Sequence, residues 1–270
     1  MSASRCDPAL TLPAIAGRLR AAGCVFADEE ARLLTEAAGA PGALREMVDR
    51  RVAGLPLEHI VGWAGFCGLR ISLEPGVFVP RPRSELLVRL AAGLAAPGSL
   101  VVDLACGSGA IGAAIAAAVP GIELHACDLD PAAVRCARRN LAAAGGQVHE
   151  GDLYAALPEH LAGRVRVIAA NVPYVPSEAV LLMPAEARMH EPLLALDGGD
   201  DGLDVLRRAA AGAGDWLAPG GHLLIETSSG QAAAAAAEFA VAGLAADVAS
   251  DEELGSTVII GRLAPDTGPE

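Results

Sequence analysis

The feature that most constrains the fold is a short apolar run that ends in a glycine-rich turn. Residues 100–104, Leu-Val-Val-Asp-Leu, have the pattern of a buried strand and run directly into Ala-Cys-Gly-Ser-Gly-Ala-Ile-Gly. Gly107, Gly109 and Gly112 satisfy G-x-G-x-x-G where a helix is expected to begin, and Asp128 ends the next predicted strand. Because a carboxylate there can accept hydrogen bonds from both hydroxyls of a ribose, the pattern predicts a nucleoside-binding site.

The second half of the chain alternates between strand and helix patterns. Strands are predicted at 100–104, 122–127, 146–150, 165–170, 221–227 and 256–262, and helices at 109–118, 131–143, 202–217 and 230–242. Such alternation is typical of an α/β fold with a doubly wound, mostly parallel sheet. Ligands of these sheets bind at the carboxyl ends of the strands, which is where the glycine turn lies.

Pattern and composition divide the chain into four segments: a helical domain (1–58), a β-hairpin linker (59–83), the α/β domain (84–263) and a polar tail (264–270). The first segment shows helical spacing without strand alternation. The linker carries glycines between apolar residues and ends in Pro-Arg-Pro-Arg. Ser84 is expected to cap the helix that follows.

Composition excludes several classes of function. The 270 residues carry a net charge of −13 and no Lys, which disfavours tight binding to a nucleic-acid backbone and excludes a lysine Schiff base. No apolar stretch is long enough for a membrane span, and charged residues interrupt any signal-peptide core. The six cysteines form no Cys-x-x-Cys pair and have no His at zinc-ligand spacing, so reduced thiols, no metal site and a cytoplasmic location are expected.

A second motif, Asn171-Val172-Pro173-Tyr174, follows the predicted strand at 165–170. The Asn side-chain oxygen and the next backbone carbonyl can both accept hydrogen bonds from a planar –NH2 group. The proline fixes the turn, and the tyrosine offers a flat apolar face. The motif resembles the Asn/Asp-Pro-Pro-Tyr signature of methyltransferases that act on amide or exocyclic amino nitrogens, with Val172 in place of the first proline. The resemblance implies that these four residues are catalytic and that Asn171, Pro173 and Tyr174 also bind the substrate.

The sequence of the glycine turn helps to distinguish between nucleoside cofactors. Asp-Leu-Ala-Cys-Gly-Ser-Gly at 103–109 resembles the Asp/Glu-x-Gly-x-Gly-x-Gly turn of S-adenosylmethionine-dependent methyltransferases, with Ala105 replacing the first glycine. Asp103 favours this cofactor over NAD, because an acid suits an amino group and opposes a pyrophosphate. Gly-Asp-Leu at 151–153 resembles their adenine-binding turn. Cofactor contacts are therefore expected from Asp103, Ala105, Cys106, Gly107, Ser108, Gly109, Asp128, Leu129, Asp152, Leu153 and Asn171.

Further motifs extend the resemblance over most of the chain. They are Leu-Glu-His-Ile-Val-Gly at 57–62, Val-Pro-Arg-Pro at 79–82, Glu-Pro at 191–192, Ala-Leu-Asp-Gly-Gly-Asp-Asp-Gly-Leu at 195–203 and Gly-Gly-His-Leu-Leu-Ile-Glu at 220–226. In this order they resemble the HemK-type protein-(glutamine-N5) methyltransferases, which methylate the Gly-Gly-Gln glutamine of peptide chain release factors. That family has a Rossmann-like, seven-stranded class I catalytic domain, a helical N-terminal domain and a hairpin linker. The resemblance implies S-adenosylmethionine as cofactor and a release factor as protein partner.

Three departures from the family pattern leave alternatives open. The family reads Pro-Arg-Pro-Glu-Thr-Glu where this chain has Pro-Arg-Pro-Arg-Ser-Glu, Val172 replaces a proline, and Glu-Thr-Ser replaces Glu-Ile-Gly at 226–228. A paralogue that methylates a different protein, a nucleic-acid adenine amino methyltransferase, a binding module without turnover and an NAD oxidoreductase are the alternatives. Arg81, between the two prolines, is expected either to bind substrate at the mouth of the site or to form a linker ion pair.

Overall fold

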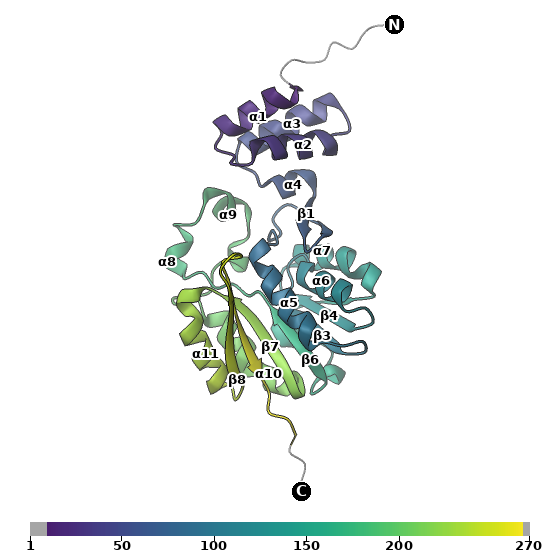
Figure 1. Cartoon of the computed structure of the whole chain (residues 1–270), viewed down its shortest axis with the longest axis vertical. Coiled ribbons are helices and arrows are strands. Elements are labelled where there is room, and N and C mark those ends of the chain that lie inside the picture. Colours follow the sequence, from purple (N-terminus) through teal and green to yellow (C-terminus); the bar gives the residue numbers. More distant parts are fainter. Residues whose placement is uncertain (1–9, 267–270) are drawn as a thin grey trace.

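The structure is a computed structural model that describes residues 10–266. An N-terminal helical unit lies at one end of the molecule and a larger sheet domain at the other, with a small hairpin between them (Figure 1). Residues 1–9 and 267–270, including parts of the predicted helical domain and tail, lie outside the described residues.

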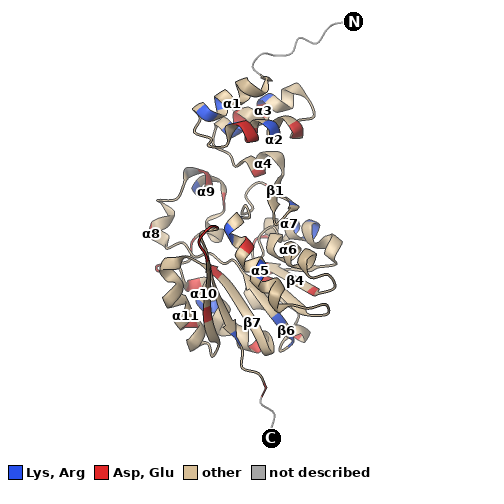
Figure 2. Cartoon of the chain, in the orientation of Figure 1, with Lys and Arg blue, Asp and Glu red and all other residues tan. Residues whose placement is uncertain are grey.

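The helical unit has its own apolar core. Its helices are α1 (Leu12–Ala21), α2 (Ala27–Ala37), α3 (Pro41–Val52) and α4 (Leu57–Val61). Ile15, Leu19, Leu34 and Val48 are fully buried within it. The predicted boundary at residue 58 falls inside α4, which continues to Val61 and ends at Gly62, whose left-handed backbone (φ +80°) stops the helix. Figure 2 shows that both signs of charge are distributed over these helices.

The hairpin is shorter than predicted. Strands β1 (Trp63–Phe66) and β2 (Leu69–Ser72) pair antiparallel. The chain then crosses to the short 3-10 helix at Pro82–Ser84 and to α5 (Glu85–Leu94). His59 ties the helical unit to this crossing, because its Nε2 lies 2.8 Å from the Val77 carbonyl oxygen.

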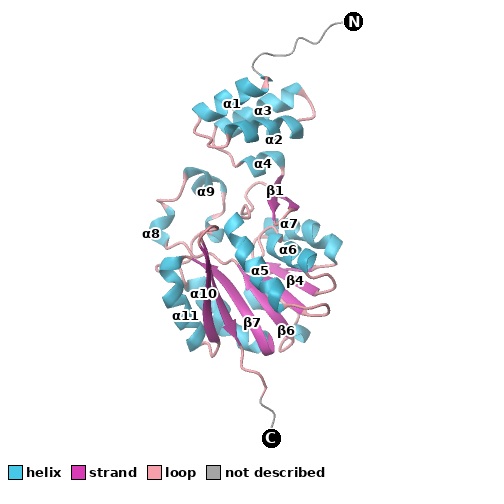
Figure 3. Cartoon of the chain, viewed as in Figure 1, coloured by secondary structure: helices cyan, strands magenta, loops and turns pink. Residues whose placement is uncertain are grey.

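The large domain contains a seven-stranded sheet in the order β5-β4-β3-β6-β7-β9-β8 (Figure 3). The strands are β3 (Leu100–Leu104), β4 (Glu123–Asp128), β5 (Gln147–Glu150), β6 (Val165–Ala170), β7 (Leu217–Thr227), β8 (Ala245–Asp251) and β9 (Ser256–Arg262). All pairs from β5 to β7 are parallel, whereas β9 is antiparallel to both of its neighbours. The predicted α/β fold with a doubly wound, mostly parallel sheet is confirmed.

Helices cover both faces of this sheet. One apolar cluster packs α5, α6 (Ala110–Ala118) and α7 (Pro131–Leu141) against it, and the other packs α10 (Asp204–Trp216) and α11 (Ala232–Val241). Every residue of β3 is buried, because its side chains alternate between the two clusters. The glycine turn therefore leaves the sheet from a strand that is buried on both faces.

The sequence missed three elements of this domain. Strand β8 has a mostly exposed, polar pattern because it lies at the sheet edge, so it lacks the apolar signal of the other strands. Helices α8 (Ser177–Val180) and α9 (Ala185–His190) are too short for a clear helical periodicity. Strand β7 also begins at Leu217, four residues before its predicted start, because the Pro-Gly-Gly turn is absorbed through a shift of register against β6.

Within residues 10–266 no helix is long and apolar enough to cross a membrane.

Candidate active site

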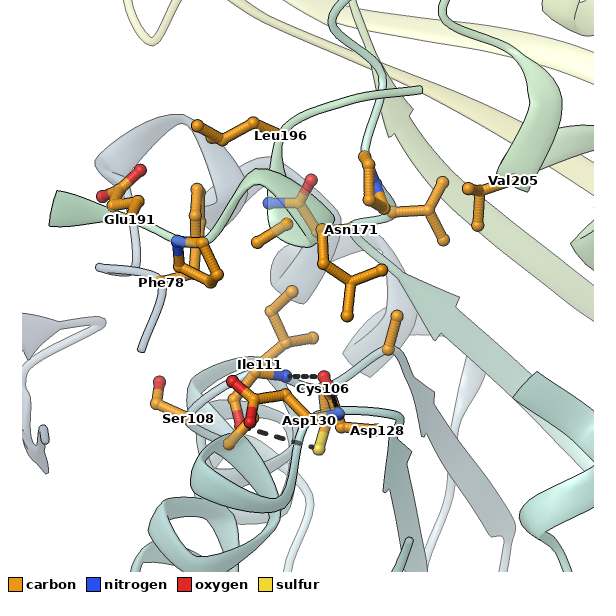
Figure 4. A pocket seen from close by; sticks show the side chains of 18 of the residues that line it. Phe78, Cys106, Ser108, Ile111, Asp128, Asp130, Asn171, Glu191, Leu196 and Val205 are labelled. Atoms are coloured by element: carbon orange, nitrogen blue, oxygen red, sulfur yellow. Dashed lines mark hydrogen bonds between the residues drawn. The ribbon is translucent and has the colours of Figure 1, made fainter. Parts of the chain in front are cut away.

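A single cavity gathers most of the predicted site residues at the carboxyl ends of the parallel strands. Figure 4 shows Asn171 on one side of it and Cys106, Ser108 and Asp128 on the other. The predicted residues that line it are Arg81, Ala105, Cys106, Gly107, Ser108, Asp128, Leu129, Asp152, Leu153, Asn171, Val172, Pro173 and Tyr174. Of the predicted set, only Asp103 and Gly109 do not line the cavity.

The glycine turn has a left-handed backbone at three positions. Gly107 (φ +53°) and Gly109 (φ +77°) adopt it readily, whereas Ala105 (φ +56°) carries a methyl group in a conformation that L residues avoid. A Cβ at Gly109 would lie 3.1 Å from the Cα of Ala137 in α7, so this glycine permits close helix packing. Around Gly107 there is open space instead, which leaves its backbone accessible from the cavity.

Asp128 connects the end of β4 to this turn. Its Oδ2 accepts a hydrogen bond from the Gly107 N–H (2.8 Å), and its Oδ1 accepts one from the Asp130 N–H (2.9 Å). A carboxylate has about four acceptor positions, so further hydrogen bonds from a ligand remain possible. Burial raises the pKa of Asp128, and these backbone hydrogen bonds oppose the rise.

Asp103 lies behind the glycine turn rather than in the cavity. It is fully buried, its Oδ2 accepts a hydrogen bond from the Gly112 N–H (2.8 Å), and its Oδ1 has no partner among the described residues. Burial raises the pKa of Asp103 to about 8. The expected contact with a cofactor amino group therefore has no geometric basis here, and Asp103 instead fixes the start of α6.

The adenine-binding turn expected at Asp152 and Leu153 does border the cavity. Leu153 is nearly buried with a positive φ of +47°, and its carbonyl oxygen accepts a contact from the Cys127 thiol. The Asp152 carboxylate pairs with Arg208 of α10 at 2.5 Å, with about half of each side chain exposed. This ion pair leaves acceptor positions on Asp152 open to the cavity.

Asn171 is oriented by a residue that the sequence assigned to another role. Its Nδ2 donates a hydrogen bond to the Ser84 Oγ (3.1 Å). Ser84 makes no capping hydrogen bond to α5, so the capping prediction is wrong. Since the amide nitrogen of Asn171 is engaged by Ser84, its oxygen Oδ1 is the group left to accept a hydrogen bond from a ligand.

Tyr174 is held by a buried carboxylate. Its hydroxyl donates to the Glu226 Oε1 (3.2 Å), and the Arg83 Nε lies 3.2 Å from the same oxygen. The Arg83 guanidinium also lies over the Tyr174 ring, 5.6 Å from its centroid, a cation–π geometry. Burial raises the pKa of Glu226, while Ser84, Arg83 and Tyr174 oppose the rise.

The loop at 196–203 is hydrogen-bonded to the turn that carries Asn171, and we call this loop the clamp. The Val175 N–H donates to the Leu196 carbonyl oxygen (3.1 Å) and the Gly198 N–H donates to the Val175 carbonyl oxygen (2.9 Å). The Gln231 amide donates to the Tyr174 carbonyl oxygen (3.0 Å). A Cβ at Gly202 would lie 2.3 Å from the Tyr174 carbonyl oxygen, so only glycine fits there. Val172, in place of the family's proline, buries its side chain in the core cluster on this face of the sheet. Packing of the Val172 side chain thus restrains the turn where the family has a second proline.

Arg81 forms the ion pair that was one of its two alternatives, and it stands at the cavity, where the other alternative would put it. It lines the cavity, and it also forms an ion pair with the buried Glu191 while lying over the Phe78 ring. The second carboxylate oxygen of Glu191 is buried without a partner among the described residues. Burial raises the pKa of Glu191, and the Arg81 charge opposes the rise.

Sequence reasoning missed several residues of the site: Phe78, Arg83, Ser84, Met183, Leu196, Val205, Arg208 and Glu226. Glu226 ends a motif that resembles the family, so its position could have suggested it, whereas Ser84 stands where the chain departs from the family pattern. Met183, Val205 and Arg208 carry no such signal, because they reach the cavity from α10 and the segment before α9.

Among residues 10–266 no group of three His, Cys, Asp or Glu side chains is arranged to hold a metal ion.

The residues present fit a nucleoside cofactor. The accessible Gly107 backbone, the spare acceptor positions of Asp128 and the apolar Leu129 and Leu153 border one continuous cavity. Ribose hydroxyls require acceptors, and a purine ring requires apolar neighbours. Asn171 follows the end of β6 and lies across the cavity from Asp128 (Figure 4).

Comparison with known proteins agrees with this geometry. The "Methyltransferase small domain" family matches residues 69–189. A release factor glutamine methyltransferase from Streptomyces coelicolor is 40% identical over 69% of this chain and 67% of its own length. The chain belongs to the release factor glutamine methyltransferase family. Its HemK-type resemblance is thereby confirmed.

One similar protein carries a different name. A protein from Streptomyces pristinaespiralis named 4-amino-L-phenylalanine/4-methylamino-L-phenylalanine methyltransferase is 40% identical over 73% of this chain and 69% of its own length. The chain matches only 63 to 67% of the length of the first three relatives, all release factor glutamine methyltransferases. A methyltransferase structure from Pyrococcus furiosus has a TM-score of 0.56 at 17% identity over 73% of this chain and 90% of its own, which shows a shared fold.

Proposed function

We propose that the protein transfers a methyl group from S-adenosylmethionine to the side-chain amide nitrogen of a glutamine, in the Gly-Gly-Gln motif of a peptide chain release factor. The observation that carries the proposal is the orientation of Asn171. Its amide nitrogen is bound to Ser84, so its oxygen is left as an acceptor between the glycine turn and Tyr174. An acceptor in this place suits a planar –NH2 group.

The chain's own residues supply binding and alignment. A primary amide nitrogen is a poor nucleophile, because its lone pair is delocalised into the carbonyl group. Asn171 Oδ1 and the Val172 carbonyl oxygen would accept its two N–H groups, while Pro173 and Tyr174 hold the glutamine side chain. S-adenosylmethionine supplies the electrophilic methyl group when bound. No strong base is required before transfer, so positioning accounts for most of the acceleration.

The cofactor would lie along the predicted residues that line the cavity. Asp128 is assigned to the ribose hydroxyls, Leu129 and Leu153 to the faces of the adenine ring, and Asp152 to its exocyclic amine. The open space around Gly107 receives the methionine part. Asp103 acts only through the turn that it supports.

Apolar residues at the mouth favour a protein as the acceptor molecule. Leu181, Leu182, Met189, Leu193 and Leu194 are 55–86% exposed along one segment, and Leu194 also lines the cavity. Exposed apolar side chains that gather in this way mark surfaces that a partner covers. The helical domain 1–58 would extend this surface, and a release factor would place both molecules in the cytoplasm.

A second candidate acceptor is an aromatic amine. The relative from Streptomyces pristinaespiralis is named for 4-amino-L-phenylalanine, and it is as similar to this chain as the release factor enzymes are. An aniline –NH2 group also suits the Asn171 and Val172 acceptors, and Arg83 would offer a charge partner for a free carboxylate. Nucleic-acid acceptors fit less well, since the chain has a net charge of −13.

The test is a methylation assay with labelled S-adenosylmethionine and two acceptors, a release factor from the same organism and 4-amino-L-phenylalanine. Label on the Gly-Gly-Gln glutamine, located by mass spectrometry, supports the proposal. Label on the free amino acid alone would replace it with the second candidate. Cofactor binding measured by calorimetry, with no label on either acceptor, would point to a paralogue with another protein substrate.

A further inference from the structure

Glu191 brings a buried carboxylate to the active-site cavity. It follows the last residue of α9, and only 6% of the residue is exposed. Its Oε1 accepts hydrogen bonds from the Val79 N–H (3.5 Å) and from the Arg81 guanidinium. Both donors belong to the stretch of chain between β2 and α5, so Oε1 fastens the α9 segment to that stretch.

The second oxygen of the same carboxylate, Oε2, has no such contact. It is buried, no described residue gives it a hydrogen bond, and Glu191 is one of the residues that line the cavity. Figure 4 shows Glu191 and Asn171 on the same side of the cavity, opposite Ser108 and Asp128. A buried carboxylate oxygen without a donor is costly and uncommon in folded proteins, so this atom is suited to a donor that arrives with a ligand.

The neighbouring side chains do not offer another acceptor. Arg81 and Arg83 have only N–H groups to give. The Tyr174 hydroxyl is held by a buried carboxylate, and the Asn171 oxygen is assigned to the –NH2 group that is methylated. Among the described side chains around the Asn171 turn, Glu191 Oε2 is therefore the oxygen left for a second N–H group of the substrate.

We propose that Glu191 is a substrate-binding residue whose Oε2 accepts a hydrogen bond from a second N–H group of the substrate, beside the –NH2 group that is methylated. In a peptide this second group is a backbone N–H next to the glutamine, and in a free amino acid it is the α-ammonium. The inference rests on the proposed transfer to an –NH2 group, but not on which of these molecules carries it. Arg81 then has a defined part, because its charge opposes the rise in the pKa of Glu191 that burial causes and so favours the ionised acceptor.

Glu191→Gln tests the Oε2 atom directly. The Val79 and Arg81 donors will keep the oxygen of the new amide at the Oε1 position, so its –NH2 group takes the place of Oε2 and opposes a substrate donor. We expect the KM for the substrate to rise by about tenfold to a hundredfold, the range for a hydrogen bond to a charged group. The kcat and the calorimetric Kd for S-adenosylmethionine should change little, because the lost contact is one of substrate binding.

Glu186→Gln is the matched control. Glu186 lies on α9 in the same segment and also pairs with an arginine, Arg51, but it does not line this cavity. Its KM for the substrate should remain that of the wild type. An equal rise in KM in the two variants would show that Glu191 only holds the α9 segment, and an unchanged KM in Glu191→Gln would also overturn the proposal.

Substrate analogues identify the donor and compare the wild type with Glu191→Gln. In a Gly-Gly-Gln peptide, each backbone N–H beside the glutamine is replaced in turn by an ester oxygen. In parallel, 4-amino-L-phenylalanine is compared with 3-(4-aminophenyl)propanoic acid, which lacks the ammonium group. Loss of the recognised N–H should raise KM by about tenfold or more in the wild type and much less in Glu191→Gln. Equal sensitivity of the two proteins would contradict the proposal.

Calorimetric binding of the release factor and of 4-amino-L-phenylalanine separates this inference from the proposed function. Binding that Glu191→Gln weakens, without methyl transfer by the wild type, would refute the proposed function alone. Turnover by the wild type that does not depend on Glu191 would refute the inference alone. Absence of both binding and transfer in the wild type would refute both.

Discussion

The Asn171 side chain donates to the Ser84 hydroxyl over 3.1 Å although 87 positions separate the two residues. This contact joins the end of β6 to the linker that enters α5, and it leaves the Asn171 oxygen as the acceptor in the cavity. The orientation of the proposed catalytic amide thus depends on a part of the chain outside its own motif.

Replacement of Asn171 by alanine tests its assignment to transfer rather than to cofactor binding. We expect kcat to fall by about a hundredfold or more, because the acceptor amide loses its alignment. The Kd for S-adenosylmethionine, measured by calorimetry, should stay close to the wild-type value. An Asn171→Ala protein with near wild-type turnover would remove Asn171 from the mechanism.

Asp128→Ala should instead raise the Kd for S-adenosylmethionine. Hydrogen bonds to a charged acceptor contribute about 1.5–3 kcal/mol each, so loss of the ribose contacts should weaken cofactor binding by at least about tenfold. Asp251→Ala is the control, since that carboxylate forms an exposed ion pair with Arg89 away from the cavity. Equal cofactor affinities in the two variants would contradict the ribose assignment.

Gly202→Ala should damage the clamp over the Asn171 turn. A Cβ there would meet the Tyr174 carbonyl oxygen at 2.3 Å, on a backbone with φ of +77°. We expect a loss of about 1–3 kcal/mol in the free energy of unfolding, measured in urea, and a lower kcat. Gly214→Ala is the matched control, because open space surrounds it in α10 and alanine should raise helix stability by up to about 1 kcal/mol. A Gly202→Ala protein as stable as Gly214→Ala would show that the clamp is unimportant.

Asp103 makes the free energy of unfolding depend on pH. Its pKa is raised by burial from an ordinary 3.8 to about 8, so the folded state holds this proton more tightly than the unfolded state does. The resulting stability is present below about pH 4 and is lost as pH rises towards 8. Asp103→Asn cannot ionise, so its stability relative to wild type should increase steadily between pH 4 and 8. Urea unfolding at a series of pH values checks this, and a difference independent of pH would contradict it.

The cavity-lining residues that could be predicted from sequence are those carried by local motifs. The glycine turn, Asp128 and the Asn171 turn each follow a strong strand signal, and parallel strands bring their carboxyl ends to one edge. Asp103 was misplaced because its motif does not reveal on which side of the turn its side chain lies. Ser84 has the pattern of a helix cap, and only the tertiary structure reveals its contact with Asn171.

Elements without periodicity were missed for a related reason. Among the strands that the structure describes, β8 pairs only with β9, and it exposes much of its surface, so burial left little pattern in its sequence. Helices α8 and α9 have four and six residues, fewer than two full turns. The exposed leucines that flank these helices, such as Leu182 and Leu194, would be judged surface residues from sequence alone, although Leu194 lines the cavity.

The central claim is that the acceptor is the glutamine of a release factor rather than a small aromatic amine. The most direct measurement is kcat/KM for methyl transfer to the release factor and to 4-amino-L-phenylalanine under one set of conditions, with the modified atom located by mass spectrometry. The account predicts a much higher value for the release factor and a methyl group on the side-chain nitrogen of the Gly-Gly-Gln glutamine. A higher value for 4-amino-L-phenylalanine, or a methyl group elsewhere on the factor, would contradict it.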